Sequence, residues 1–317
     1  MSAPVSIVVP ALGPSEHLER ALAALALALA PRGGIDELLV VDDSGRGELG
    51  GWVAQRSSVA RTLARAENGG FARALGDGVR AARHGLVFAM NSDLEPRVNF
   101  LEPLVAALDD ARVFAAVPRV LRRGAGESRV ESLVRLVERE GRVHVEQPFV
   151  EADAPARMLD GPCALPFALG GAFLARRDEF LALGGFEPLF EPFYMEDVDL
   201  SWRARRAGRT CLHVPDSVCV HENQATIARV APRSLVEAAM SKNRLLFEWL
   251  HLDGAALERH LAALDELALT AWLAEDRSAL ETLALALEQL EGVLAARAAA
   301  PRADAFEVLA RACDPLR

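Results

Sequence analysis

Four groups of polar residues interrupt otherwise apolar stretches of this chain, and their side chains suit metal and acid–base chemistry. Asp42-Asp43 and Asn91-Ser92-Asp93 each follow an apolar run, while Glu196-Asp197 and His221 lie further along. A carboxylate beside amide and hydroxyl oxygens suits Mg²⁺ or Mn²⁺ carrying a substrate diphosphate, which usually needs only one or two protein carboxylates. We therefore interpret Asp93 as a candidate metal ligand.

Three further groups could act beside such a cation. His221 follows the apolar run SVCV and could add an imidazole ligand if the metal is Mn²⁺. Gly69-Gly70 stands at the start of a predicted helix, where backbone N–H groups can approach an anion. Asp197 lies near the N-terminus of another predicted helix and is a candidate general base for a bound hydroxyl.

Each group also has a purely structural interpretation, which stays open at this point. Asp42-Asp43-Ser44-Gly45 is typical of a turn and helix cap, and Asn68-Gly69-Gly70 is typical of a loop. Asn91-Ser92-Asp93 could cap a following helix, Glu196-Asp197 suits the first turn of any helix, and an isolated His221 is more often structural. A shared site is favoured because the groups recur where an α/β sheet places its ligands.

The elements that must position these groups alternate between strand and helix. Apolar runs predict strands over 5–10, 37–45, about 58–63 and 86–90, and periodic segments predict helices over 16–30 and 68–85. This alternation predicts an α/β fold with a mostly parallel sheet and right-handed crossovers. The carboxyl ends of its strands would carry Asp42-Asp43 and Asn91-Ser92-Asp93.

The middle of the chain is less regular. We predict a hairpin with its turn near Gly141, a strand around 171–175, and a helix over 195–208 that ends at Gly208. The segment 210–222 predicts one or two more strands.

The C-terminal part is predicted to be helical. Ala, Leu and Glu dominate, and the pattern predicts helices over 234–250, 254–274, 276–298 and 303–314. Leucines at 280, 283, 287, 290 and 294 form an apolar stripe on the third of these. We expect it to pack on the catalytic part or on a second copy of the chain, which makes a homodimer possible. A helix lying on a membrane is the alternative, although the segment is acidic.

Composition limits the partners. The chain has 317 residues, 51% of them hydrophobic, and a net charge of −10, which argues against a nucleic-acid partner. Its four cysteines show no CxxC spacing and suit a reducing compartment. The apolar stretch 21–30 is shorter than the ~20 residues that span a bilayer, and no basic signal region precedes the first strand. We expect a cytoplasmic protein, with contact at the inner face of the membrane as an option. A nicotinamide-dependent enzyme is disfavoured because no GxGxxG follows the first strand.

The order of these motifs resembles family 2 glycosyltransferases, above all the bacterial rhamnosyltransferase-like branch. The resemblance covers roughly residues 3–250 and runs through VSIVVP, VVDDSG, NGGFARALGDGV, FAMNSDLEP, LGGAFLARRDEFLALGGFEPLFEPFYMEDVDLSWRARRAG and VCVHE. It implies a GT-A fold, a mixed, mostly parallel Rossmann-like sheet flanked by helices, with the helical C-terminal region as an appendage. It also implies inversion at the anomeric carbon.

The resemblance also implies site residues. Asp93, in the place of the family's DXD metal motif, and His221 would hold Mg²⁺ or Mn²⁺, and Asp197 would be the base, with Glu196 beside it. The nucleotide-sugar would contact Pro10, Asp42, Asp43, Asn68, Gly69, Gly70, Asn91 and Ser92. The acceptor side would carry Gly170, Gly171, Asp199 and Trp202.

Three departures refine the prediction. Ala11-Leu12-Gly13 replaces a polar pair after the first strand, Asn91 replaces the first Asp of the metal motif, and QxxRW of processive synthases is missing. We expect a non-processive enzyme that moves a sugar from a dTDP- or UDP-linked donor to a hydroxyl of a glycan or lipid-linked acceptor. The alternative is a catalytically silent GT-A-like binding or scaffold protein.

We also predict the domain organisation from the motif order. Residues 1–233 would form the catalytic domain, with a nucleotide-sugar half over about 1–118 and an acceptor half over about 119–233. Residues 234–317 would form the helical C-terminal region.

Overall fold

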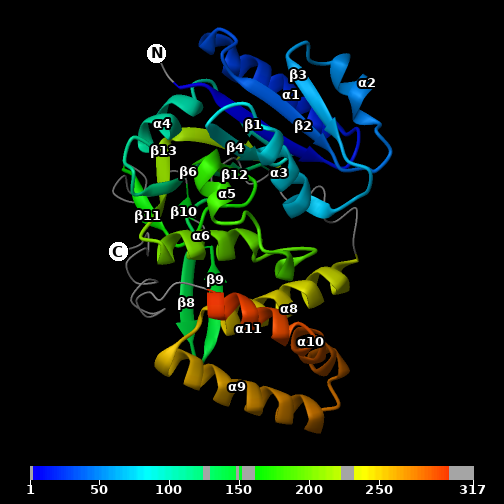
Figure 1. Ribbon diagram of the computed structural model, residues 1–317, viewed down its shortest axis with the longest axis vertical. Helices are drawn as coiled ribbons and strands as arrows, with labels where there is room; N and C mark the ends of the chain where they lie inside the picture. The colour runs from blue at the N-terminus through cyan, green and yellow to red at the C-terminus, as the bar shows by residue number, and fades with distance from the viewer. Residues whose placement is uncertain (1–2, 124–128, 148–149, 152–160, 223–231, 300–317) are drawn as a thin grey trace.

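The computed structural model describes residues 3–123, 129–147, 150–151, 161–222 and 232–299. Its upper part is a twisted sheet covered by helices, and its lower part is a layer of helices (Figure 1). No helix among the described residues combines the length and the apolar character needed to span a membrane. The predicted helix over 303–314 lies outside the described residues.

The first part of the chain alternates between strand and helix, as the sequence predicts. The elements are β1 (Val5–Ala11), α1 (Glu16–Leu29), η1 (Ala30–Arg32), β2 (Glu37–Asp42), α2 (Leu49–Ala54), β3 (Ala60–Ala64), α3 (Gly70–Ala81), β4 (Leu86–Met90), β5 (Leu94–Pro96) and α4 (Leu101–Ala107).

The second part adds the strands that complete the sheet and the helix that carries the carboxylate pair. The elements are β6 (Val113–Arg122), β7 (Arg129–Val130), β8 (Arg135–Arg139), β9 (Arg142–Glu146), β10 (Val150–Glu151), β11 (Cys163–Leu165), β12 (Ala172–Arg176), α5 (Arg177–Ala182), η3 (Pro188–Phe190), α6 (Glu196–Arg206) and β13 (Thr210–His221).

The main sheet is mixed, with a parallel half that matches the prediction. Its order is β10-β7-β6-β12-β4-β1-β2-β3, and β13 pairs with β5, β6 and β11. Strands β3, β2, β1 and β4 run parallel. Strand β12 runs antiparallel between β4 and β6. The carboxyl ends of β2 and β4 therefore lie along one edge, where β12 begins.

Helices cover both faces of this sheet because alternate strand residues point to opposite sides. Val5, Ile7 and Val9 of β1 pack with α1 and α4, whereas Val8 packs with α3. Helix α3 approaches the sheet so closely that a Cβ atom on Gly78 would lie 2.3 Å from Cγ1 of Val8. All seven residues of β1 are buried, as expected for a strand covered on both sides.

The C-terminal part differs from the prediction in one respect. Its helices are α8 (Arg233–His251), α9 (Gly254–Leu273), α10 (Arg277–Leu287) and α11 (Leu290–Ala299). The prediction of one helix over 276–298 is wrong, because the chain breaks between α10 and α11. The break lets α11 run against α8, where Nη1 of Arg297 donates to the carbonyl oxygens of Trp249 and Leu250.

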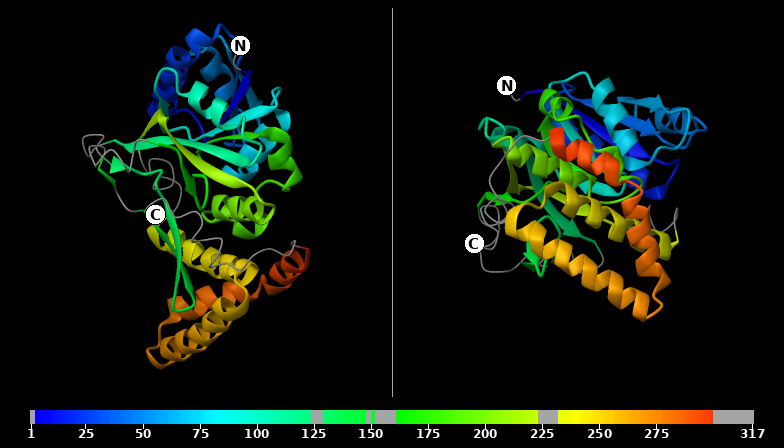
Figure 2. Two further views of the ribbon diagram at one scale, coloured as in Figure 1. Left: turned by 90° about the vertical axis from the view of Figure 1, so that its left-hand side faces the viewer. Right: turned by 60° about the horizontal axis from the view of Figure 1, so that its bottom comes forward.

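The hairpin of β8 and β9 connects the two parts of the molecule. It runs from the sheet down to α9, as both Figure 1 and the left view of Figure 2 show. Its turn at Glu140-Gly141 confirms the predicted hairpin. Nδ1 of His260 on α9 lies 2.6 Å from the Gly141 carbonyl oxygen, and the Val143 N–H donates to Glu248 of α8 at 2.7 Å.

Candidate active site

The carboxylates of Asp42 and Asp43, at the end of β2, accept hydrogen bonds from N–H groups of the protein itself. Asp42 has no exposed surface, and its two carboxylate oxygens accept from the N–H groups of Ser44 at 3.0 Å and Leu49 at 2.9 Å. This is the turn-and-cap role that the sequence left open. In this arrangement the Asp42 side chain has no exposed surface with which it could contact a nucleotide, in contrast to the prediction.

The glycine pair that opens α3 binds an anion, and that anion is Asp43. The N–H groups of Gly69 and Gly70 donate to the Asp43 carboxylate at 3.0 and 2.9 Å, and Arg65 pairs with the same group. Asn68 is exposed, and its side chain accepts from Gly70 at 3.1 Å. The predicted nucleotide-facing loops therefore lie together and are held by one buried carboxylate. Pro10 is buried in β1 beside them, in register with Val41 of β2.

At the end of β4, the strand pairing brings Asp93 and His221 together. Leu94 of β5 is opposite His221 of β13, and the Glu222 N–H donates to the Asp93 carbonyl at 3.1 Å. Nε2 of His221 lies 3.3 Å from Oδ1 of Asp93. The Asp93 side chain is 7% exposed, so the pair sits in a largely dehydrated place.

Glu131 completes this group, and the sequence analysis missed it. Its Oε2 lies 2.9 Å from Nδ1 of His221, on the far side of the ring from Asp93. Burial alone would lower the pKa of His221, but the hydrogen bonds to Asp93 and Glu131 outweigh burial and raise it to about 9. Burial would likewise raise the pKa of Asp93, yet its hydrogen bond to His221 holds that pKa below its usual value.

This arrangement fits a divalent cation whose remaining ligands come from a substrate. A metal-bound histidine usually donates its other ring N–H to a carboxylate, and Glu131 is in place to accept it. Within the described ranges, no three His, Cys, Asp or Glu side chains are arranged so that they could hold one metal ion by themselves. Two protein ligands suit Mg²⁺ or Mn²⁺ that also binds diphosphate and water.

Asp197 is linked to the end of β4 through the glycine pair Gly170-Gly171. Its Oδ2 accepts from the Gly170 N–H at 2.8 Å, and its Oδ1 accepts from the Val198 N–H at 2.8 Å. The neighbouring Gly171 lies against Asn91, so closely that a Cβ on Gly171 would lie 2.1 Å from the Asn91 side chain. Consecutive Cα atoms are only ~3.8 Å apart, so the two glycines bring the start of α6 next to the end of β4.

The carboxylates of Glu196 and Asp197 are partly exposed and share an unusual electrostatic setting. Burial raises the pKa of both groups, and the nearby charge of Asp197 raises that of Glu196 further. The N–H groups of Gly170 and Val198 oppose this rise at Asp197 alone. Asp197 is thus the carboxyl whose charge these two N–H groups stabilise, which makes it the base candidate of the pair.

Two residues expected on the acceptor side are in the core instead. Asp199 and Trp202 have no exposed surface. Asp199 binds Nε2 of His251 at 2.8 Å and Nη2 of Arg203 at 2.7 Å. This burial contradicts the predicted contact of the two residues with an acceptor, because both side chains extend from α6 toward α8. Gly170 lies at the Asp197 carboxylate, and the half-buried Ser92 lies between Asn91 and Asp93.

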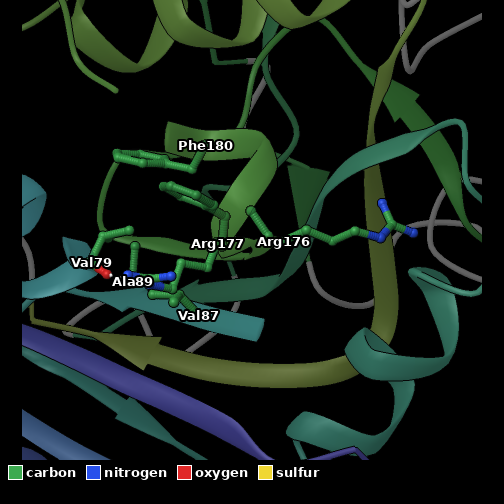
Figure 3. Close-up of a pocket in the computed structure, with 8 residues that line it drawn as sticks. Val79, Val87, Ala89, Arg176, Arg177 and Phe180 are labelled. Carbon is green, nitrogen blue, oxygen red and sulfur yellow. Dashed lines mark hydrogen bonds between the residues drawn. The ribbon is translucent and has the colours of Figure 1, made fainter. Parts of the chain in front are cut away.

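A small apolar gap elsewhere in the sheet is unrelated to this chemistry. It lies between α3, β4, β12 and α5, and Phe180, Val79 and Val87 line it (Figure 3). Arg176 extends away from it, and Nε of Arg177 donates to the Val79 carbonyl at 3.0 Å. The gap is a packing feature of the core.

Comparison with solved structures shows the fold. A structure titled "Crystal structure of GalNAc-T7 with UDP, GalNAc and Mn2+" matches 80% of this chain and 48% of its own, at 17% identity and a TM-score of 0.62. A mannosyltransferase from Pyrobaculum calidifontis, in complex with GDP-Man and Mn²⁺, matches 98% of this chain and 79% of its own, at 19% identity and a TM-score of 0.52. The arrangement of sheet and helices is therefore that of GT-A glycosyltransferases, as the resemblance implied.

Comparison of sequences gives the family. The pre-mycofactocin glycosyltransferase of Mycobacterium tuberculosis is 27% identical over 158 residues, which are 50% of this chain and 31% of that protein. The chain thus matches about a third of this relative's length. The family model described as glycosyl transferase family 2 matches residues 6–178, from β1 through Asp93 and Gly170-Gly171 into α5. Since this match takes in more than half of the chain, the chain belongs to glycosyl transferase family 2.

Proposed function

We propose that this enzyme transfers one sugar per encounter from a nucleoside-diphosphate sugar to a hydroxyl of a glycan or lipid-linked acceptor, with inversion. The observation that carries the proposal is the contact of Gly170 with Asp197 and of the adjacent Gly171 with Asn91. This contact links the start of α6, with the base candidate Asp197, to the end of β4, two residues before the metal-ligand candidate Asp93. The GDP-Man, UDP and Mn²⁺ in the titles of the structural relatives support a nucleotide-sugar donor and a divalent cation.

In this proposal, Asp93 and Nε2 of His221 would hold Mg²⁺ or Mn²⁺. The cation, when bound, would neutralise the charge that develops on the departing nucleoside diphosphate. Glu131 would accept a hydrogen bond from Nδ1 of His221, which would leave Nε2, on the side of Asp93, for the cation. The chain's own contribution on this side is to orient two ligands and to keep them in a largely dehydrated place.

Asp197 would take the proton of the acceptor hydroxyl as the oxygen attacks the anomeric carbon from the face opposite the leaving group. Its two oxygens already accept backbone N–H groups, which fixes the direction of the carboxylate. Glu196 would hold the acceptor through a hydrogen bond while it keeps its own proton. A positioned general base contributes about 10²–10⁴-fold to such a step.

The donor side would be built from the loops around Asp43, Asn68 and Gly70. The proposal includes residues 1–233 as the catalytic domain and keeps dTDP- and UDP-linked sugars, rhamnose among them, as first donor candidates. GDP-linked sugars join this set because of the mannosyltransferase relative. The catalytically silent alternative is disfavoured because the Asp93–His221 and Glu196–Asp197 groups are both present and assembled.

A binding screen followed by chemistry tests the proposal. A panel of dTDP-, UDP- and GDP-sugars is screened by thermal shift with and without Mn²⁺, because a ligand that binds only the folded state raises its stability. We expect one nucleotide class to raise the melting temperature only when Mn²⁺ is present. The selected donor should then be hydrolysed slowly without acceptor, and NMR of the first sugar product should show the inverted anomer. No donor binding and no hydrolysis across the panel would overturn the proposal.

A further inference from the structure

The backbone immediately before Glu196 adopts a conformation that residues other than glycine rarely adopt. Tyr194 and Met195 both have positive φ, +65° and +76°, and neither is a glycine. Two consecutive residues in the left-handed region turn the chain sharply into α6. Such a conformation persists only where the surroundings fix it, and it often lies at a functional site.

Asn243 on α8 supplies the fixing contacts. Its Nδ2 donates to the carbonyl oxygens of Phe193 at 2.7 Å and Tyr194 at 3.0 Å, and it also contacts the carbonyl of Phe190. The Asn243 side chain has no exposed surface. Because only the amide nitrogen can donate to carbonyls, these acceptors also fix the orientation of the amide.

The same segment reaches the donor side of the site. Glu191 makes two ion-pair contacts of 2.6 Å with Arg73 of α3, and Nζ of Lys242 donates to the Glu191 carbonyl at 3.1 Å. The carbonyl oxygen of Pro192 lies 3.8 Å from where a Cβ on Gly70 would be. Residues 190–195 thus run from the glycine loop to Glu196-Asp197, and α8 holds them from behind.

We propose that Asn243 is a positioning residue for glycosyl transfer: it fixes the left-handed turn at Tyr194-Met195 and thereby the aim of the Asp197 carboxylate. Helix α8, which lies outside the part matched by the family model, is then part of the working enzyme. This inference rests on the proposed role of Asp197. Asn243 itself touches no reacting atom, so its effect is expected on turnover and not on donor binding.

The test compares Asn243→Ala with Glu248→Ala, a matched change on the same helix. Glu248 also has no exposed surface, but it binds Val143 and Arg142 of the hairpin and not residues 190–195. We expect Asn243→Ala to lower kcat by about 10–100-fold, since a misplacement of the order of 1 Å can cost about 10²-fold. Its donor KM and its Mn²⁺-dependent binding of the nucleoside diphosphate should stay within about threefold of wild type, well inside the change expected of kcat.

Glu248→Ala should lose a comparable amount of thermal stability and keep kcat within about threefold, because a change remote from the base leaves the reacting geometry in place. Hydrogen exchange should rise in peptides covering 190–200 for Asn243→Ala only. Equal kcat losses in the two variants at equal folded fraction, or unchanged exchange in 190–200, would overturn the inference. If wild type transfers no sugar from any donor, the proposed function fails, and the exchange result still decides whether Asn243 holds the turn.

Discussion

The backbone N–H of Gly170 donates to Oδ2 of Asp197 at 2.8 Å, and this bond joins the turn before β12 to the start of α6. The next residue, Gly171, gives its carbonyl to the Asn91 N–H at 2.8 Å. One glycine pair therefore contacts both halves of the proposed chemistry. The space for a side chain differs between the two glycines, so alanine substitutions at 170 and 171 form a matched pair.

Gly171→Ala should be more damaging than Gly170→Ala. A Cβ at 171 would lie 2.1 Å from Asn91, whereas one at 170 would lie 3.3 Å from Asp197. Overpacking of this kind costs about 1–3 kcal/mol, so we expect such a loss of unfolding free energy for Gly171→Ala and a smaller one for Gly170→Ala. Urea denaturation measures both. Equal losses would show that the Asn91 contact does not limit the space at 171.

Asp197→Asn should abolish most turnover and leave the donor bound. Loss of a general base lowers the rate by about 10²–10⁴-fold, and Asn cannot accept the proton. Glu196→Gln is the control, because it neutralises the neighbouring carboxyl and leaves the proposed base in place. We expect less than a tenfold loss for Glu196→Gln, since the charge that does the chemistry stays at Asp197. Steady-state kinetics and calorimetry with the nucleoside diphosphate distinguish the two; a comparable loss in donor affinity for Asp197→Asn would reject the base assignment.

The activity should fall on the acid side at a pH above the ordinary range of aspartate. The reaction needs ionised Asp197, and burial raises the pKa of this group, so turnover is lost as pH falls through the raised value. We expect the midpoint of the acid limb of kcat well above the usual Asp pKa of ~3.9. A profile that stays flat down to that value would mean that another group limits the rate or that Asp197 is fully hydrated.

Glu131→Gln should weaken the cation site although Glu131 would not touch the metal. Removing a carboxylate behind a histidine ligand typically lowers metal affinity by about 10–100-fold, because the imidazole loses its fixed orientation and some basicity. Calorimetric titration of Mn²⁺ into the protein with the nucleoside diphosphate measures this. Glu138→Gln serves as control, because Glu138 pairs with Arg259 at the far end of the hairpin. Identical Mn²⁺ affinity in wild type and Glu131→Gln would argue against His221 as a ligand.

The sequence predicts the sheet better than the contacts around the candidate site. Continuous apolar runs identify β1, β2 and β4, and polar residues follow β2 and β4 at one edge of the sheet. Glu131 belongs to no sequence motif. It contacts His221, which lies 90 residues later in the chain, only because β13 lies beside the segment that follows β7.

The face of α6 is equally hidden from the sequence. The family resemblance implied that Asp199 and Trp202 lie on the acceptor side. Their burial depends on His251, 52 residues later, which offers Asp199 a partner in the core. The break after α10 is another tertiary effect, since no proline marks it and only packing of α11 on α8 explains it.

Two aspartates on the first turn of α6 should respond to amide substitution in opposite ways. Asp199 is fully buried, and the hydrogen bond from His251 and the charge of Arg203 outweigh burial and hold its pKa below the usual value. Its contribution to stability is therefore present above the unfolded-state pKa and is lost as pH falls through the folded-state value. Removing one partner of a buried pair costs about 3–5 kcal/mol, so we expect this loss for Asp199→Asn at neutral pH.

The pKa of Asp197 shifts in the opposite direction from that of Asp199, so the pH dependence of its contribution to stability is also opposite. Because burial raises its pKa in the folded state, the wild-type carboxylate contributes stability at low pH that is lost as pH rises through the folded-state value. Asp197→Asn carries no such titration, so its stability relative to wild type should increase as pH rises from the usual Asp pKa of ~3.9 to the folded-state value of about 6. Urea unfolding of both variants at several pH values checks this. The folded protein should gain stability when the charge of a half-buried base is removed. If Asp197→Asn instead loses stability relative to wild type as pH rises, Asp197 is an ordinary structural carboxylate like Asp199.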